Sequence, residues 1–417
     1  MIQTKQEDAL GDVEGLERRS ILSPDLVDLS TGTPAYELFP IDLLQSAAAR
    51  GISKETLPTY LQYGASLGPE RFRRSIARWV DRELSVGTCA PGSVRPADPD
   101  EILVTNGASH SVDLVCKHFT QRGDTVLVEE VTYFLMFPIF REHGLNVVPV
   151  KMDLTTGVDL KDLEEKIIIH QPSLVYIIPT YHNPTGATVP AESRAALVEI
   201  VRSAPRQCYL VADEVYQFLY FYGEGRLPPP PLWCYDRDVV ISLNSFSKLL
   251  APGLRLGWIY TGNKEVLERL DSDGVAISGG GFNPFTSRIV YEAIESGALA
   301  KHVAMLRGEI RKRAEALSNA LRRSFPEGGI EFVQPEGGYF VWATLGDKRY
   351  SDPCDMLGVA LTMKTAFRLG EDCAVDTPET KEGAKRSMRL CFAHYSSDKL
   401  EEGAKRLAKT FTSTLNN

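Results

Sequence analysis

The 417-residue sequence has few cysteines, and they follow no pattern that would bind a metal or build a disulfide framework. The seven cysteines stand at positions 89, 116, 208, 234, 354, 373 and 391. They are odd in number, widely separated and free of any CxxC pair, which is typical of reduced thiols in the cytoplasm. No metal site is expected.

The sequence also lacks a membrane-spanning apolar run and an excess of positive charge. No uninterrupted apolar stretch reaches the roughly 20 residues that cross a bilayer, and the first residues are polar and acidic, unlike a secretory signal. With 46 Lys and Arg against 55 Asp and Glu, the net charge of −9 disfavours nucleic-acid binding. We therefore expect a soluble, cytoplasmic protein whose partners are small molecules, with no nucleic acid and no membrane.

Strand-like and helical segments alternate through the middle of the chain. Short β-rich runs recur near residues 101, 124, 145, 173, 208, 238 and 256, with helical patterns between most of them. This alternation predicts an α/β fold with a mostly parallel sheet between helices, here of seven strands, plus a smaller α+β domain. We expect an N-terminal segment (1–45) that packs with the small domain, a large domain (46–297) and a small C-terminal domain (298–417).

The segment SLNSFSKLLAPGLRLGWIY carries Lys248 just after a strand-like run. Open α/β sheets bind ligands at the carboxyl ends of their strands, so Lys248 is expected in a site. Ser245, Ser247 and Arg255 supply the hydroxyl and guanidinium donors that a buried phosphate ester needs. A solvated surface lysine is the alternative for Lys248 taken by itself.

The segment CYLVADEVYQFLYF places Asp213 at the end of an apolar strand and Tyr216 three residues later. Asp213 is either a helix cap or the partner of a pyridine nitrogen, whose pKa an ionised aspartate raises. Tyr216 is a donor for a phenolic oxygen on such a ring. Asn183, in the loop of YIIPTYHNPTGAT, is either a second such donor or a turn-forming residue.

Two further segments suggest anion binding. In ILVTNGASHSVDLVCKHF, Gly107, Ala108 and Ser109 lie between a strand and a helix, whose N-terminus attracts phosphate, although a plain connection capped by Ser109 fits equally. Arg389, in the strand-like SMRLCFAHY, is costly to bury unless it meets an anion, and we assign it the α-carboxylate of a substrate. Tyr133 either stacks on a ring or packs in the core.

The motifs TNGAS, YHNPTG, DEVY, SFSK, GLRLGW, PEGGYFVW and MRLCFA occur in this order between residues 28 and 410. Together they resemble those of the class I/II aminotransferases, which use pyridoxal 5′-phosphate (PLP) and have PLP fold type I. The segments LQYGASLGPERFR and SFSKLLAPGLRLGW look most like the branch that contains 2-aminoadipate, kynurenine and aromatic aminotransferases.

The resemblance implies a role for each motif residue. Lys248 would form the Schiff base with PLP and move the proton, Asp213 would pair with the pyridine nitrogen, and Asn183 and Tyr216 would hold the phenolic oxygen. The implied cofactor contacts also comprise Gly107, Ala108, Ser109, Tyr133, Ser245, Ser247, Arg255 and, from the neighbouring subunit of a homodimer, Tyr63. The implied substrate contacts are Gly32, Asn183 and Arg389, with Tyr36, Arg18, Arg19 and Phe282 as further candidates.

The resemblance therefore predicts transfer of an amino group from an L-amino acid to a 2-oxo acid, 2-oxoglutarate being usual in this family, by a ping-pong mechanism through a Lys248 aldimine. A PLP-dependent lyase or cyclase on the same fold is the main alternative, because the acidic stretch 369–386 departs from the glycine-proline loop of many relatives. A PLP-fold transcriptional regulator is disfavoured, since only a short acidic segment precedes the fold.

Overall fold

A computed structural model describes residues 25–55, 57–84, 96–223 and 226–413. Its large sheet has seven strands in the order β2-β10-β9-β8-β7-β3-β4, in which β10 is antiparallel to its neighbours and the other pairs are parallel. The strands are β2 (Ile102–Thr105), β3 (Thr125–Glu129), β4 (Asn146–Val150), β7 (Leu174–Ile177), β8 (Tyr209–Asp213), β9 (Val240–Ser245) and β10 (Gly257–Tyr260). The predicted α/β fold and its mostly parallel sheet are confirmed.

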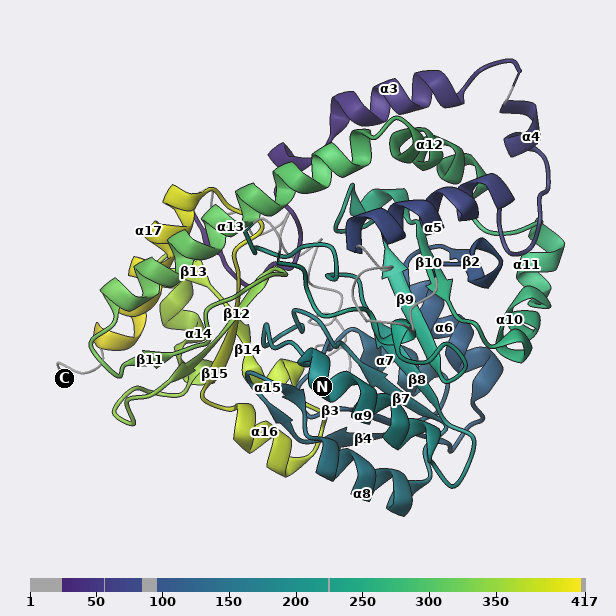
Figure 1. The fold of residues 1–417 in the computed structure, drawn as a ribbon. Helices are drawn as coiled ribbons and strands as arrows, with labels where there is room; N and C mark the ends of the chain where they lie inside the picture. The colour runs from purple at the N-terminus through teal and green to yellow at the C-terminus, as the bar shows by residue number, and fades with distance from the viewer. Residues whose placement is uncertain (1–24, 56, 85–95, 224–225, 414–417) are drawn as a thin grey trace.

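Helices cover both faces of this sheet (Figure 1). Successive side chains of a strand point to opposite faces, so Leu210 and Ala212 of β8 enter one core while Tyr209 and Val211 enter the other. The first core is covered by α5 (Glu70–Leu84), α8 (Leu160–His170), α9 (Ala191–Arg202) and α12 (Pro284–Glu295), and the second by α6 (Ala108–Phe119), α7 (Met136–Glu142) and α10 (Lys264–Asp271). Burial on both faces explains why the strands are apolar throughout.

A smaller sheet, of order β11-β12-β15-β14, forms the second unit. Its strands are β11 (Ile330–Glu331), β12 (Phe340–Leu345), β14 (Arg368–Leu369) and β15 (Ser387–Cys391). The long helix α13 (Ala298–Ser324) packs against the C-terminal helix α17 (Ser397–Thr412) beside it, and in Figure 1 α13 runs from the helices of the large sheet to this unit.

The described N-terminal residues contact both units. Strand β1 (Val27–Asp28) pairs in parallel with β13 (Thr365–Ala366), and α3 (Ile41–Gly51) packs against α12. The expected boundaries at 45/46 and 297/298 stay a prediction. The remaining α-helices and strands of the described residues are α4 (Leu57–Leu61), β5 (Met152–Asp153), β6 (Gly157–Val158), α11 (Gly274–Gly279), α14 (Pro353–Thr362), α15 (Gly370–Cys373) and α16 (Pro378–Ala384).

Two further features of the described residues bear on function. The acidic stretch 369–386 contains two short helices, α15 and α16, rather than an open loop. No helix within the described ranges combines the length and the apolar character that a membrane crossing requires.

Candidate active site

A cavity of about 210 Å³ lies where β8 and β9 end at their carboxyl sides and β15 of the small sheet approaches them. Three segments far apart in the sequence supply its charged groups: Asp213 ends β8, Lys248 follows β9, and Arg389 lies in β15. The lining comprises Gly32, Thr33, Ala108, Ser109, Tyr133, Leu135, Ile178, Asn183, Asp213, Val215, Tyr216, Ser245, Ser247, Lys248, Pro252, Arg255, Phe340 and Arg389. Twelve of these residues were singled out from the sequence, whereas Gly107, which was also expected at the site, is not among the lining.

Lys248 reaches into the cavity and does not extend into open solvent. Its Nζ donates to the backbone carbonyl of Gly32 at 2.9 Å, and the Tyr339 hydroxyl donates to the Lys248 carbonyl at 3.3 Å. A Cβ at Gly32 would lie 3.2 Å from Phe340 Cζ, so the glycine lets the N-terminal segment approach closely. The amine is thereby held at the wall shared by the two sheets.

Asp213 is the carboxylate of the cavity and is only 4% exposed. Burial raises the pKa of Asp213 to about 6. A hydrogen bond from the Tyr176 hydroxyl to Oδ2, at 2.7 Å, acts in the opposite direction and lowers this pKa. The backbone N–H of Val215 lies 3.5 Å from Oδ1. An opposite charge favours the ionised form of a buried carboxylate, so a ligand with a positive nitrogen would lower the pKa of Asp213 and pair with it.

Arg389 is 1% exposed and is held by three contacts. Its Nη2 donates to the Ser30 carbonyl at 2.7 Å, its Nη1 donates to Asn183 Oδ1 at 3.1 Å, and its guanidinium carbon lies 4.4 Å from the centre of the Phe340 ring. Its Nε has no hydrogen-bond partner among the described residues. A buried guanidinium with unused donors fits an anionic ligand such as a carboxylate.

The N-terminus of α6 forms one wall of the cavity. Gly107, the residue before the helix, has φ 93°, a left-handed conformation that favours glycine. Ala108 and Ser109 open the helix, whose first N–H groups have no intrahelical acceptor. Arg255 Nη2 donates to the Asn106 carbonyl at 3.1 Å and would lie 3.3 Å from a Cβ at Gly107. Backbone donors and a guanidinium therefore meet here, as phosphate binding requires.

The turn after β9 completes this wall. Ser245 Oγ donates to Ser247 Oγ at 2.9 Å and accepts from the backbone N–H of Ser247 at 3.0 Å, which orders the hydroxyl pair. Asn283 Nδ2 donates to the carbonyls of Leu254 at 3.0 Å and Arg255 at 2.6 Å. This second asparagine, which no sequence motif indicated, fixes the backbone at the arginine.

Tyr216 and Tyr133 supply aromatic walls. The Tyr216 ring packs 5.4 Å from the Tyr339 ring and 6.1 Å from the Phe340 ring, between centroids. Burial raises the pKa of Tyr216 well above its usual value, so its hydroxyl stays protonated and can donate. Tyr133 follows β3 and lines the cavity, with Phe134 edge-on to its ring at 5.9 Å.

Other expected residues do not line the cavity of their own chain. Tyr63 is 76% exposed and Tyr36 is 64% exposed. Tyr36 packs edge-on to Phe39 and His394, while Phe282 is buried against His110. Arg18 and Arg19 lie outside the described residues.

The structure also reveals residues that the sequence did not single out. Thr33, Leu135, Ile178 and Pro252 line the cavity but carry no chemical signature in the sequence. Beneath Asn183, the buried His182 directs Nε2 toward Glu129 Oε2 at 3.4 Å, while its Nδ1 lies 2.8 Å from Thr185 Oγ1. This pair supports the loop that presents Asn183.

The stretch 369–386 contacts the loop that carries Tyr133. The backbone N–H of Thr132 donates to the Cys373 carbonyl at 2.8 Å, and that of Val375 donates to the Glu130 carbonyl at 3.0 Å. No residue of 369–386 is among the lining of the cavity in the described chain. It therefore borders the site through the backbone of residues 130–132.

The charges of the cavity match a ligand of defined type. Lys248, Arg255 and Arg389 supply three cationic groups against one carboxylate, Asp213. A phosphorylated pyridine aldehyde carries an aldehyde that condenses with an amine, a ring nitrogen that can pair with a carboxylate, and an anionic phosphate. An amino-acid substrate adds a second anion, its α-carboxylate. The residues present therefore fit PLP and an amino-acid substrate.

Comparison with known proteins agrees with this fit. The family described as "Aminotransferase class I and II" matches residues 24–407. Aromatic-amino-acid aminotransferase 1 of Thermococcus litoralis is 30% identical over 97% of this chain and 93% of its own length. The 2-aminoadipate transaminase of Thermus thermophilus is 31% identical over 94% of this chain and 91% of its own. A solved structure of Pyrococcus horikoshii kynurenine aminotransferase, in complex with PMP, KYN as substrates and KYA as products, superposes with TM-score 0.83 at 27% identity, covering 96% of this chain and 94% of that one.

Proposed function

Because this chain belongs to the class I and II aminotransferase family, we propose that it moves an amino group from an L-amino acid to 2-oxoglutarate in a ping-pong reaction that uses PLP. The observation that carries the proposal is the convergence of Lys248, Asp213 and Arg389 on one cavity from three separate segments. A relative that binds PMP, KYN and KYA supports the cofactor and the class of substrate.

The cofactor contributes chemistry that no side chain can supply. When bound, PLP offers an aldehyde that condenses with amines and a protonated pyridine ring that withdraws electrons from the substrate α-carbon. The residues that would hold it are Lys248 for the aldehyde, Asp213 for the nitrogen, and Asn183 and Tyr216 for the phenolic oxygen. Ala108, Ser109, Ser245, Ser247 and Arg255 would hold the phosphate, and Tyr133 would face the ring.

The protein's own residues then orient the substrate and move its proton. Arg389 binds the α-carboxylate with the N–H groups that it does not donate to the Ser30 carbonyl and Asn183 Oδ1. That grip leaves the α-hydrogen directed toward Lys248 Nζ, which removes the proton and returns it. The carbonyl of Gly32, 2.9 Å from Nζ, gives the amine an acceptor within the same wall.

The test separates amino transfer from the alternatives on the same fold. The purified protein is incubated with a panel of amino acids, with and without 2-oxoglutarate, and the products and the cofactor absorbance are followed. Formation of glutamate that depends on 2-oxoglutarate, and is lost in Lys248→Ala, supports the proposal. Release of ammonia, thiol or pyruvate without an acceptor would assign a lyase instead, and transfer only to another 2-oxo acid would overturn the assigned acceptor.

We also propose that the protein is a homodimer in which Tyr63 completes the partner's site. Tyr63 and the apolar side chains of Leu61 and Ile277 are more than half exposed, and the backbone next to Tyr63 is held by a hydrogen bond from the Gly64 N–H to the Gly280 carbonyl at 3.0 Å. Exposed apolar residues that lie together favour association.

Mixing two inactive variants tests this shared site. A heterodimer of Lys248→Ala and Tyr63→Ala chains should contain one site with both residues intact, so the mixture recovers activity that neither variant has alone. A mixture that stays as inactive as its parents, or a wild-type chain that is monomeric by light scattering, would contradict the shared site.

A further inference from the structure

Tyr176 contacts Asp213 from within the core and is not among the residues that line the cavity. It belongs to β7, beside β8, and is 1% exposed. Its hydroxyl donates to Asp213 Oδ2 at 2.7 Å, while Asp213 itself lines the cavity. The Phe140 ring of α7 packs edge-on against Tyr176, with 5.7 Å between centroids, so the phenol is fixed within the core.

A phenol hydroxyl has a single hydrogen to donate, and two buried carboxylates, Asp213 and Glu129, lie near the Tyr176 hydroxyl. Glu129, at the end of β3, is served by other donors: the Ile178 N–H at 3.0 Å and the Thr132 hydroxyl at 3.3 Å. Asp213 has a weaker alternative, since the Val215 N–H is 3.5 Å from its Oδ1. The Tyr176 hydrogen is therefore committed to Asp213, where it forms the shorter of the two hydrogen bonds.

We propose that Tyr176 is a positioning residue that holds Asp213 Oδ2 from within the core, so that Oδ1 faces the cavity and the carboxylate stays ionised for the pyridine nitrogen of the cofactor. The inference rests on the proposed function, because it assigns Asp213 to that nitrogen. Tyr176 touches neither the cavity nor the substrate, so it acts only through Asp213.

The groups around Asp213 set the direction of the effect. Burial and the nearby charge of Glu129 favour its neutral form, whereas the Tyr176 hydroxyl, the Val215 N–H and Lys248 favour its charged form. Loss of the Tyr176 hydroxyl removes a group that lowers the pKa of Asp213. The carboxylate then becomes neutral at a higher pH than in the wild type.

The experiment is Tyr176→Phe, which removes only the hydroxyl. Cofactor is stripped from the protein, and the Kd of added PLP is measured from tryptophan fluorescence at several pH values between 5.5 and 8.5. We expect Tyr176→Phe to bind PLP about 10-fold more weakly at neutral pH, the loss of one hydrogen bond to a charged group. The ratio to wild type should grow as the pH falls, because the variant carboxylate is protonated first.

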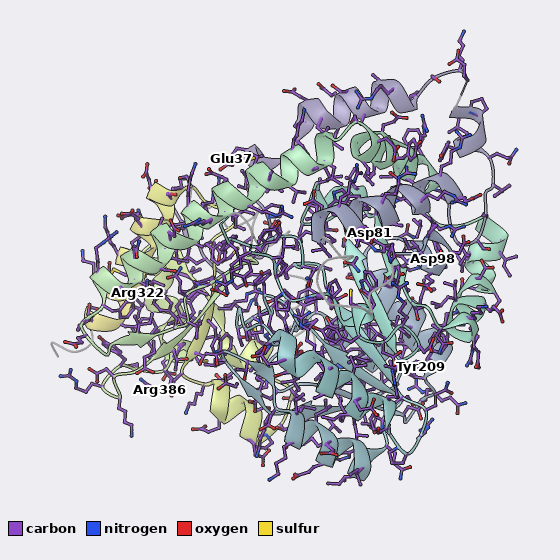
Figure 2. The ribbon with its side chains drawn as sticks, viewed as in Figure 1. Glu37, Asp81, Asp98, Tyr209, Arg322 and Arg386 are labelled. Atoms are coloured by element: carbon purple, nitrogen blue, oxygen red, sulfur yellow. The ribbon has the colours of Figure 1, made fainter. Side chains whose placement is uncertain are left out.

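A matched control separates this role from a purely structural one. Tyr260 is also buried in the large sheet, and its hydroxyl donates to Glu101 and accepts from the N–H of Asp98 at 3.0 Å, at the edge where Figure 2 labels Asp98. Tyr260→Phe loses an equivalent phenol–carboxylate bond outside the cavity. It should lower the unfolding temperature while leaving the pH dependence of cofactor binding as in the wild type.

Two outcomes would overturn the inference, and a further variant isolates its premise. The inference fails if Tyr176→Phe binds PLP with the wild-type pH dependence, or if Tyr260→Phe changes it equally. Asp213→Asn tests the premise that Asp213 holds the cofactor. If Asp213→Asn binds PLP with wild-type affinity, the role of Asp213 itself is refuted. If Asp213→Asn loses affinity for PLP while Tyr176→Phe binds it normally, only the inference about Tyr176 is refuted. Should Tyr176→Phe not fold, the cofactor-free protein must show a slowly exchanging hydroxyl proton in its NMR spectrum that disappears in Asp213→Ala, which has no side-chain acceptor, and the absence of that proton from the wild type would equally refute the inference.

Discussion

Replacing Arg389 with lysine keeps a positive charge in the cavity but removes the planar fork. Arginine has five N–H groups, and the structure uses one on Nη2 for the Ser30 carbonyl and one on Nη1 for Asn183 Oδ1. The Nε–H and one hydrogen on each Nη remain for a carboxylate, enough for a two-pronged grip. A lysine amine offers a single nitrogen, and it must also serve the Ser30 carbonyl and Asn183.

The size of the effect follows from the contact that is lost. One hydrogen bond between charged groups is worth about 1.5–3 kcal/mol, which corresponds to a change of about 10- to 100-fold in binding. Because the carboxylate is held in both the bound substrate and the transition state, most of this loss should appear in KM for the amino acid and less in kcat. Arg389→Lys should therefore raise KM about 10- to 100-fold.

Steady-state kinetics with the best amino donor from the panel measures this change. The matched control is Arg386→Lys, because Arg386 precedes the same strand and donates to the carbonyls of Leu345, Tyr350 and Asp347, yet lies away from the cavity at the outer end of the small sheet (Figure 2). It should reduce stability with KM unchanged. An Arg389→Lys enzyme with wild-type KM, or an equal rise in Arg386→Lys, would refute the reasoning.

Three further predictions concern the scaffold of the site. A Cβ at Gly337 would lie 2.5 Å from atoms of the buried Tyr181 ring, so Gly337→Ala should lower the free energy of unfolding by about 1–3 kcal/mol in denaturant titrations. The control is Gly383→Ala, whose Cβ would meet no atom within 4 Å and should cause no such loss. Equal losses in the two variants would argue against a steric cause. Although burial raises it, hydrogen bonds from Lys117, His118 and the N–H groups of Ala276 and Val275 hold the pKa of Asp273 well below its usual value. Asp273→Asn should therefore lower the free energy of unfolding by about 1–2 kcal/mol at neutral pH. This difference from the wild type should shrink below about pH 4, where the aspartate of the unfolded chain takes up its proton. A difference that persists in acid would contradict this reasoning. Asn283→Asp keeps a residue that tolerates the φ of 53° but loses both donors to the backbone at Arg255. It should weaken PLP binding about 10-fold in the fluorescence assay, and an unchanged Kd would show that the arginine needs no such support.

Much of the large domain could be predicted because its strands carry a strong local signal. Strands buried on both faces are apolar throughout, and the helices between them have a clear period, so all seven strands of the large sheet were expected at their observed places. The same logic placed Asp213 and Lys248 in a site, because polar residues at or just after the carboxyl ends of such strands meet at one edge of the sheet. Strand β14 and helices α15 and α16 were not foreseen, since each is too short for a periodic pattern to emerge.

The amino-acid sequence by itself determined which segments form the strands of the large sheet, how side chains alternate along a strand and which charged residues lie at or just after strand ends. Only the tertiary structure decided what lies opposite each of them. The Lys248 amine meets the carbonyl of Gly32 across 216 positions of sequence, and Arg389 meets Asn183 across 206. In the sequence, Tyr176 is one more residue of an apolar strand. Only the pairing of β7 with β8 places Asp213 within 2.7 Å of its hydroxyl. Periodicity records the orientation of a side chain within its own element, whereas a contact depends on how two elements pack, and that is set by the whole core at once.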